Sequence, residues 1–466
     1  MKKRELVIVL LCVLLLSNIA TFLIARFFFY EERVETAAQE ELEESDLLME
    51  VYRILDEGYF QPLDRETLFR GAVEGMIDSL EDPHTSYLSP DSLDDMLIHT
   101  TGSFSGIGVE ITEDEGEILI LRVIGGSPSE EAGLLKGDRI VKVEGSPTLE
   151  LSLDEAARKL RGPSGTEVEV TVKRSGEEEL REVVLTRADI DMDTIFSRRI
   201  NEQFAYIEVT NFDQNTGSDF KSTLDQLEEE GLNGLILDLR NNPGGLLDEA
   251  ISLGQAIVPQ GEITRVVDRE GNVLDKHHST AEPKDYPIYV LVNEFTASGA
   301  EIIAGALQDS EQGILIGQPT YGKATVQQLH FLSDGSGLRY TIASYLTPKG
   351  QDLHAEGLKP DYEVEQPEEY FLQHQSIPGG LEEGDTGDQV VLLQTMLKFL
   401  QYPLEVTGVF GEETIETIER FQQDQGIGVS GELDDLTRDE IRKVLGEKAE
   451  AVDAQLQKAL ELLHLS

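Results

Sequence analysis

Cysteine is almost absent from this chain of 466 residues, and the only one is Cys12. It lies in an apolar stretch near the amino terminus, so the rest of the chain can form no disulfide and has no thiol nucleophile. Paired cysteines and the H-E-x-x-H motif, which hold zinc in many proteins, are missing as well. The sequence therefore predicts neither a metal site nor a bound cofactor.

Basic residues are also scarce. The chain has 38 Lys and Arg residues against 90 Asp and Glu residues, and its formal net charge is −52. Nucleic acids and anionic lipids are bound through basic side chains, which neutralise their phosphates. We therefore expect no nucleic acid partner, and we interpret the negative surface as a source of solubility.

Charge is missing over one long run, Leu6 to Ala25, which follows the basic start Met1-Lys2-Lys3-Arg4. A helix of about 20 apolar residues spans a bilayer, and basic residues before it stay in the cytoplasm. The run is longer than the apolar part of a cleavable signal, about 7–15 residues, and no A-x-A site precedes the acidic segment from Glu31. We expect a single-pass signal anchor in the cell membrane, with the catalytic part extracytoplasmic. Secretion after signal cleavage is the alternative.

Two short segments carry residues suited to a hydrolytic site. Ser298 lies in F-T-A-S-G-A-E, between a predicted buried strand over Ile288–Val292 and a predicted helix over Ala300–Leu307, and Lys323 lies in Y-G-K-A-T-V-Q. A serine becomes a nucleophile when a neighbouring base takes its proton, and a lysine can be that base where apolar surroundings lower its pKa. On these two segments alone, an N-cap serine and a solvated lysine are the simpler interpretation.

Histidine is the competing base, as in Ser-His-Asp hydrolases. The G-x-S-x-G motif of many such enzymes does not occur. His277 and His278 are adjacent in a predicted polar loop, and His464 lies in the last predicted helix. We interpret His84, which lies in the amino-terminal part of the chain, as structural. The histidines therefore offer no suitably placed base.

Motifs along the chain resemble those of the carboxy-terminal processing proteases, also called tail-specific proteases. Besides the two segments above, the chain has D-P-H-T-S-Y-L at residues 82–88 and the glycine-rich turn L-R-N-N-P-G-G at residues 239–245. The resemblance implies that Ser298 is the nucleophile, that Lys323 is the general base and that Gln327 orients the lysine amine. It also implies an oxyanion hole formed by glycine N–H groups, one from Gly244 or Gly245 and one from Gly299.

A second unit resembles a PDZ domain. It begins with Gly106, Ile107, Gly108 and Val109, where two glycines let the backbone turn its N–H groups toward a peptide carboxylate, and the next strand can pair with an extended tail. The expected partners are proteins or peptides with a free carboxyl terminus. Arg161, which follows a helix predicted over Leu153–Leu160, is a candidate contact between this domain and the protease core, although an exposed arginine is more often solvated.

Residues 378–446 resemble the small three-helix peptidoglycan-binding domain. The resemblance rests on the segments G-D-T-G-D-Q-V-V-L-L-Q, G-V-F-G-E-E-T and F-Q-Q-D-Q-G. Such a domain can also serve only for packing, so peptidoglycan is an expected partner and a generic helical bundle is the alternative. The last helix, over residues 447–466, has Leu456, Leu460 and Leu463 on one stripe and is predicted to cap this bundle.

The predicted fold class is multidomain α/β. Its parts in chain order are a signal anchor (1–30), a juxtamembrane segment and helical prelude (31–95), a PDZ-like β-rich domain (96–188), an α/β protease core (189–372), a small three-helix domain (378–446) and a C-terminal helix (447–466). The prelude should contain two helices with a break near Gln61-Pro62.

The predicted function is a membrane-anchored serine endopeptidase that cleaves proteins whose carboxyl-terminal tails bind the PDZ-like domain. The alternative is an inactive envelope scaffold that joins a tail-binding module to a wall-binding module. A homo-oligomer is compatible with the sequence, which does not decide the oligomeric state.

Overall fold

A computed structural model describes residues 45–114, 116–174, 177, 179–376 and 380–465. The chain forms two compact units, Met1–Glu81 and Asp82–Ser466. The predicted signal anchor lies outside the described residues. Within the described ranges, no helix is both long enough and apolar enough to cross a membrane.

Two helices make up the described part of the first unit, as the sequence predicted. The first covers residues 45–58, and the second, α2, is Arg65–Asp78. Pro62 lies between them, where it disfavours helical geometry in the residue before it. The rings of Tyr52 and Phe69, one from each helix, lie 5.2 Å apart, so the two helices pack against each other.

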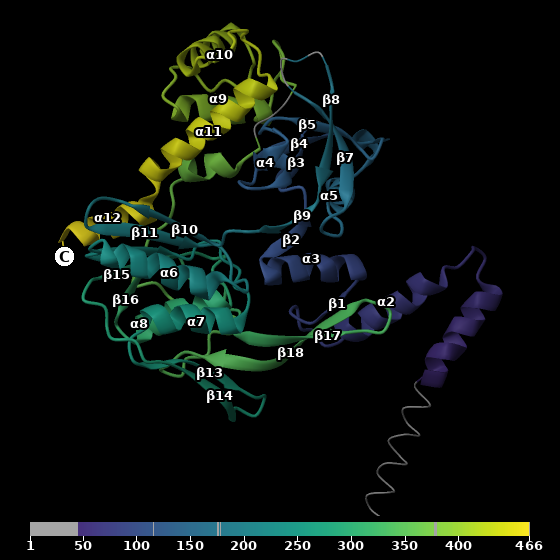
Figure 1. The fold of residues 1–466 in the computed structure, drawn as a ribbon, viewed down its shortest axis with the longest axis vertical. Coiled ribbons are helices and arrows are strands. Elements are labelled where there is room, and N and C mark those ends of the chain that lie inside the picture. The colour runs from purple at the N-terminus through teal and green to yellow at the C-terminus, as the bar shows by residue number, and fades with distance from the viewer. Residues whose placement is uncertain (1–44, 115, 175–176, 178, 377–379, 466) are drawn as a thin grey trace, which may run out of the picture. The chain divides into compact units, whose positions relative to one another are not determined.

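The predicted PDZ-like domain lies in the second unit and is built on an antiparallel sheet with the strand order β3-β4-β5-β7-β8 (Figure 1). Its elements are β3 (Val109–Asp114), β4 (Glu117–Val123), α4 (Pro128–Glu131), β5 (Arg139–Val143), β6 (Ser146–Pro147), η1 (Thr148–Glu150), α5 (Leu153–Leu160), β7 (Glu167–Lys173) and β8 (Arg181–Thr186). The side chains of Ile107, Ile120 and Val170 are at most 1% exposed and form part of its core. The helix predicted over residues 153–160 is confirmed as α5.

Two strands, β2 (Ser103–Gly106) and β9 (Ala188–Asp191), pair with each other where the chain enters and leaves this domain. Helix α3 (Pro90–Thr101) precedes β2 and ends at Gly102, whose φ of 68° is the left-handed geometry common after helices. The boundary drawn after residue 95 falls inside α3. Helix α3 therefore spans the predicted boundary between the helical prelude (31–95) and the PDZ-like domain (96–188).

The core is built on a six-stranded sheet with the order β10-β11-β12-β15-β16-β19. Strand β10 (Ile195–Arg199) is antiparallel to β11 (Phe204–Val209), and the remaining strands run parallel to β11. They are β12 (Gly234–Asp238), β15 (Ile288–Val292), β16 (Gly313–Gly317) and β19 (Tyr362–Glu363). Strands β12 and β15 are buried along their whole length, as expected of a parallel sheet that is covered on both faces.

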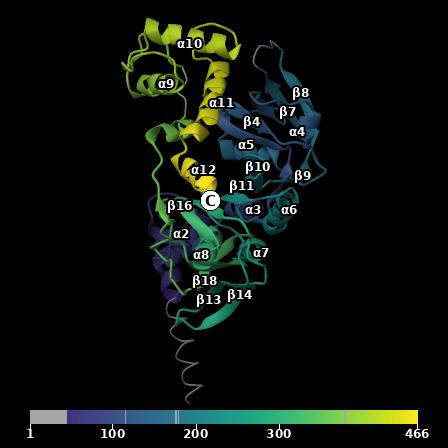
Figure 2. The same cartoon turned by 90° about the vertical axis from the view of Figure 1, so that its left-hand side faces the viewer.

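Helices cover both faces of this sheet. Successive strand residues point to opposite sides, and both faces present apolar side chains. One face packs with helices α6 (Thr216–Glu229), α7 (Leu247–Ile257) and α8 (Gly299–Asp309), and its side chains include Leu235, Leu237 and Val290. The other face includes Ile236, Tyr289 and Leu291, and it packs with helix α12 (Ala454–Leu465), the last of the chain (Figure 2).

The prediction that the last helix caps the three-helix domain was therefore wrong. Helix α11 (Asp435–Val452) ends at Asp453. Helix α12 then packs on the six-stranded sheet, where Leu456, Ala459 and Leu463 are at most 3% exposed. An apolar stripe shows that a helix packs, but not against what. Here the stripe meets the apolar side chains that β12, β15 and β16 turn to this face.

The helical domain before α12 contains α9 (Asp388–Phe399), α10 (Glu412–Gln425) and α11. These helices share a core in which Leu393, Phe421 and Leu445 are 0% exposed. A short helix, η2 (Glu368–His374), leads from the protease core to this domain.

A second sheet completes the protease core, with the order β1-β18-β13-β14 and with β17 paired to β18. Its strands are β1 (Ser86–Leu88), β13 (Gly261–Val267), β14 (Val273–Ser279), β17 (Thr325–Phe331) and β18 (Gly337–Leu346). Ser298 lies at the end of the turn after β15 in the first sheet, and Lys323 lies two residues before β17 in the second. The two predicted catalytic residues therefore come from different sheets.

Candidate active site

Ser298 lies at the turn between β15 and α8. Its backbone has φ 54° and ψ −117°, a geometry that is unfavourable for a residue with a Cβ atom. Such a residue persists only where its surroundings hold it. Here the Ser298 N–H donates to the Glu301 carboxylate at 2.9 Å, and the Ser298 C=O accepts from the Tyr345 hydroxyl at 3.0 Å.

One cavity, with a volume of about 530 Å³, brings the predicted catalytic residues together. Its lining includes Ser298, Lys323, Gln327, Gly244, Gly245 and Gly299. Apolar side chains contribute much of the rest, among them Met96, Leu97, Leu246, Ile302 and Val326. Within the described residues, no hydrogen bond joins Ser298 Oγ to Lys323 Nζ, and both residues line the cavity that a substrate would enter.

Burial lowers the pKa of Lys323, and the positive charge of Arg339 lowers it further, whereas the carboxylates of Glu301 and Asp82 act in the opposite direction. Arg339 lines the same cavity from β18. The net shift favours the neutral amine, which is the form that can accept a proton. The sequence predicted a shift of this sign from apolar surroundings, and the structure adds the neighbouring arginine.

Arg339→Gln should raise the pKa of Lys323, because it removes the repulsion between the two cations. If neutral Lys323 is the general base, the rising limb of kcat/KM against pH should then move to higher pH. Peptide hydrolysis measured between the usual pKa values of histidine and lysine would cover this limb. Arg339→Lys keeps the charge and should leave the limb in place. An unshifted limb in Arg339→Gln would mean that another group titrates.

Gln327 lies on β17 in the same cavity, but its Nε2 donates to the Thr325 hydroxyl at 2.8 Å. No hydrogen bond joins its amide to the Lys323 amine, although the structure describes both residues. Its role in orienting the lysine therefore stays a prediction.

His84 lies in the D-P-H-T-S-Y-L segment, where its backbone N–H donates to the Asp82 carboxylate at 2.9 Å. Burial lowers the pKa of His84, and repulsion from Lys323 lowers it further, against the opposing effect of Asp82.

The glycines of the L-R-N-N-P-G-G turn lie against Ser298. A Cβ atom on Gly244 would be 2.6 Å from the Ser298 Cβ, and the φ of Gly244 is 97°, so this position requires glycine. The Gly244 N–H donates to the Asn242 side chain at 2.8 Å. The N–H groups of Gly245 and Gly299 have no acceptor among the described residues. Of the two predicted alternatives, Gly245 is therefore the one whose N–H has no acceptor among the described residues, and the oxyanion role itself stays a prediction.

Glu301, like Arg339, is a residue of this site to which the sequence analysis assigned no role. Its side chain is fully buried, and its carboxylate accepts four hydrogen bonds. The donors are the N–H groups of Ser298 (2.9 Å), Gly322 (2.8 Å) and Lys323 (2.9 Å) and the hydroxyl of Thr320 (2.5 Å). Glu301 therefore ties the serine turn to the lysine loop. Its position three residues after Ser298 is a capping-box spacing, which would have predicted only the bond to Ser298.

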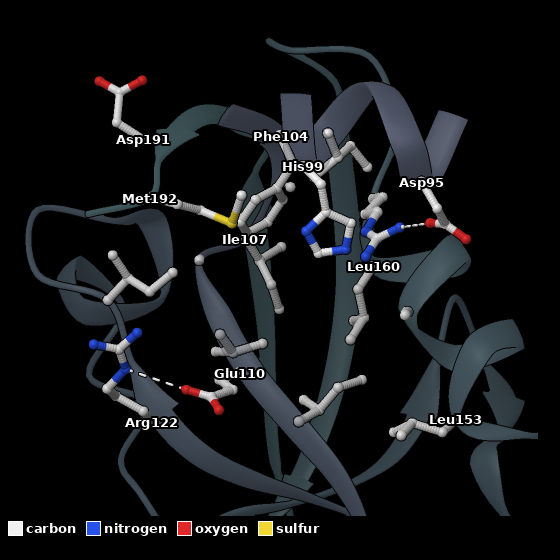
Figure 3. Close-up of a pocket in the computed structure, with 18 of the residues that line it drawn as sticks. Asp95, His99, Phe104, Ile107, Glu110, Arg122, Leu153, Leu160, Asp191 and Met192 are labelled. Atoms are coloured by element: carbon white, nitrogen blue, oxygen red, sulfur yellow. Dashed lines mark hydrogen bonds and ion pairs between the residues drawn. The ribbon is translucent and has the colours of Figure 1, made fainter. Parts of the chain in front are cut away.

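A second cavity, of about 440 Å³, lies along the PDZ domain (Figure 3). Its lining includes Gly106, Ile107, Gly108 and Val109, and it also includes Leu153 and Leu160 of α5. The φ of Gly108 is 81°, and a Cβ atom there would lie 2.2 Å from the Ser127 Cβ, so the turn before β3 requires glycine.

Helix α3 borders both cavities. Its Ile98 lines the second cavity, called the PDZ groove below, its Met96 lines the cavity of Ser298 and Lys323, and its His99 lines both. Arg161 forms an ion pair with Asp95 of α3 at 2.7 Å (Figure 3). The Arg161 side chain is 36% exposed and that of Asp95 58%, and exposed pairs of this kind contribute about 0–1 kcal/mol to stability. The observed ion pair of Arg161 is therefore with α3, and it is weak enough for another partner to replace Asp95.

Four family models match this chain. They are peptidase family S41 over residues 203–364, a PDZ domain over 119–174, a putative peptidoglycan binding domain over 386–441 and the activating protease CtpB N-terminal domain over 19–92. The family and the fold class predicted from the motifs are thereby confirmed.

Similar proteins cover most of the chain. The carboxy-terminal processing protease CtpA of Bacillus subtilis is 34% identical over 419 residues, which are 90% of each chain. The carboxyl-terminal-processing protease of Synechocystis is 37% identical over 349 residues, 70% of this chain and 82% of that one. Among solved structures, the photosystem II D1 C-terminal processing protease is 29% identical, with a TM-score of 0.41 and coverage of 71% of this chain and 94% of that one.

Proposed function

The chain belongs to the carboxy-terminal processing proteases of peptidase family S41, and on this premise we propose that Ser298 and Lys323 are its catalytic dyad. It is a serine peptidase of a family that uses a Ser/Lys dyad. The observation that carries the proposal is the shared cavity, which Ser298 and a lysine with a lowered pKa both line.

In the proposed reaction, neutral Lys323 takes the proton of Ser298 as its Oγ attacks the scissile carbonyl carbon. The carbonyl oxygen becomes negative and accepts hydrogen bonds from the N–H groups of Gly245 and Gly299. The C–N bond then breaks, Lys323 gives its proton to the leaving amine, and an ester forms on Ser298. Neutral Lys323 next deprotonates a water molecule, which hydrolyses the ester and restores the serine.

The PDZ groove is proposed to bind the carboxyl-terminal tail of the substrate. An extended tail would pair with β3, with its carboxylate at the N–H groups of residues 106–109 and its last side chain near Ile107 and Leu160. Because α3 borders both cavities, a tail that displaces the Arg161–Asp95 pair would also move side chains of the catalytic cavity. Binding activates the enzyme only if the tail binds the active arrangement better than the resting one.

This proposal predicts that a peptide with a free carboxyl terminus is cleaved about tenfold faster, as kcat/KM, than the same peptide with an amidated terminus. Ala157→Phe should remove the difference, because Ala157 lines the groove from α5. Lys159→Phe, on the same helix outside this lining, should preserve it. Gly108 is unsuitable for this test, since any side chain there would overlap Ser127. Equal cleavage of both peptides by the unaltered protein would contradict tail recognition.

The location of the protein is a further part of the proposal. A signal anchor over residues 1–30 would hold the chain in the cell membrane with its catalytic part outside, and secretion after signal cleavage is the alternative. The match of residues 386–441 to a peptidoglycan binding domain supports an extracytoplasmic location and peptidoglycan as a partner of the helical domain.

A further inference from the structure

A buried ion cluster lies at the start of the glycine-rich turn. Arg240 donates to both carboxylate oxygens of Asp238, at 2.5 to 3.0 Å, and through Nη1 to both oxygens of Asp453, at 3.0 and 2.8 Å. All three side chains are at most 8% exposed. Nη1 also donates to Gln455 Oε1 at 3.2 Å. Two segments separated by more than 200 residues therefore meet at one guanidinium. The N–H groups of a guanidinium can hold a carboxylate through two hydrogen bonds.

Asp453 directly precedes α12 and caps its first turn. Its carboxylate accepts the N–H of Leu456 at 2.9 Å and the side-chain N–H of Gln366 at 2.7 Å. The apolar stripe of α12 then packs on the face of the core sheet described above. The sheet therefore holds the helix, and the helix in turn holds the Asp453 carboxylate against Arg240.

A short chain of contacts leads from Arg240 to the predicted oxyanion donor. The next residue, Asn241, donates its N–H to Asn293 at 2.9 Å. Asn242, which is fully buried, accepts the Gly244 N–H on its side chain and the Ala297 N–H on its C=O, at 2.8 and 2.9 Å. Residues 240–245 thus form one connected turn, in which Gly244 lies against the Ser298 Cβ and Gly245 against Phe212.

We propose that Asp453 is a positioning residue for peptide hydrolysis. By holding Arg240 from the far side, its carboxylate fixes the start of the turn and so places the Gly245 N–H toward the oxyanion. Helix α12, although it follows the helical domain in sequence, is then part of the catalytic unit. The inference depends on the proposed dyad and on Gly245 as an oxyanion donor.

Asp453→Asn tests this inference, because asparagine can still cap α12 while the charge that binds Arg240 is lost. We expect kcat per active serine to fall about tenfold with little change in KM, since an oxyanion contact acts mainly in the transition state. Active serine is counted by titration with a fluorophosphonate. A merely structural role would lower the amount of titratable enzyme and leave its kcat unchanged.

Glu450→Gln is the matched control, because Glu450 of α11 pairs with Arg198 of β10 at 3.0 Å through exposed side chains. It should keep the kcat of the unaltered protein. If Asp453→Asn does not fold, Gln455→Met removes another acceptor of Arg240 Nη1 and should lower kcat in the same direction, by less. An unchanged kcat in the folded variant, at normal active-serine content, would overturn the inference. Failure of a fluorophosphonate to label Ser298 in the unaltered protein would instead overturn the dyad.

Discussion

Lys323→Arg should abolish peptide hydrolysis about as completely as Ser298→Ala. Arginine keeps a positive charge but cannot lose its proton near neutral pH, so it cannot take the proton of the Ser298 hydroxyl. We expect kcat to fall about 10⁴-fold or more in both variants, the scale seen when a nucleophile or its base is removed. Hydrolysis of an unfolded protein substrate and fluorophosphonate labelling of Ser298 are the two measurements.

Lys349→Arg is the control for this experiment, since its side chain is 63% exposed and lies outside the cavity lining. It should cleave and be labelled like the unaltered protein. Near-normal turnover in Lys323→Arg would exclude a lysine base. If the unaltered protein itself neither cleaved nor reacted with the probe, the alternative of an inactive scaffold would be favoured.

Glu301→Gln should have the second-largest effect, because the carboxylate accepts four hydrogen bonds in a fully buried place. Each carboxylate oxygen accepts two of them, so an amide nitrogen in place of either oxygen leaves two donors without an acceptor. At about 1–3 kcal/mol for each unsatisfied buried donor, the free energy of unfolding should fall by about 2–6 kcal/mol. In one placement of the amide the N–H groups of Ser298 and Lys323 lose their acceptor, and in the other the donors of Gly322 and Thr320 do, so the link between the serine turn and the lysine loop is weakened. We expect kcat to fall about 10²-fold, the scale of losing one oxyanion donor.

Thermal unfolding and kcat per titrated serine measure the two parts of this prediction separately. Glu294→Gln makes the same chemical change at an exposed position of the same turn and should alter neither. If Glu301→Gln unfolded at the temperature of the unaltered protein and turned over within threefold of its rate, the role assigned to Glu301 would be wrong.

Much of the fold follows from local patterns in the sequence. The apolar run at residues 288–292 is strand β15, and residues 153–160, which match the second helix of a PDZ domain, form helix α5. Motifs with fixed spacing identified the PDZ and helical domains and the segments that carry Ser298 and Lys323. Such features depend on residues a few positions apart, which backbone geometry places on one face or at one turn.

The contacts that complete the site were decided by tertiary structure. Glu301 reaches Lys323 across 22 residues, and Arg240 reaches Asp453 across 213. Arg339 enters the cavity from β18, and the engagement of the Gly244 N–H by Asn242 leaves Gly245 as the free donor. No local spacing encodes these pairs, because they exist only after the two sheets and α12 have packed.

The sequence by itself therefore determined the family, the order of the domains and the residue types of the predicted dyad. Tertiary structure alone decided which charges surround Lys323, which glycine N–H is free and which surface α12 covers. The physical reason is that an apolar stripe or a charged side chain specifies the kind of neighbour it requires. Which neighbour it meets depends on the packing of segments that lie far apart in the chain.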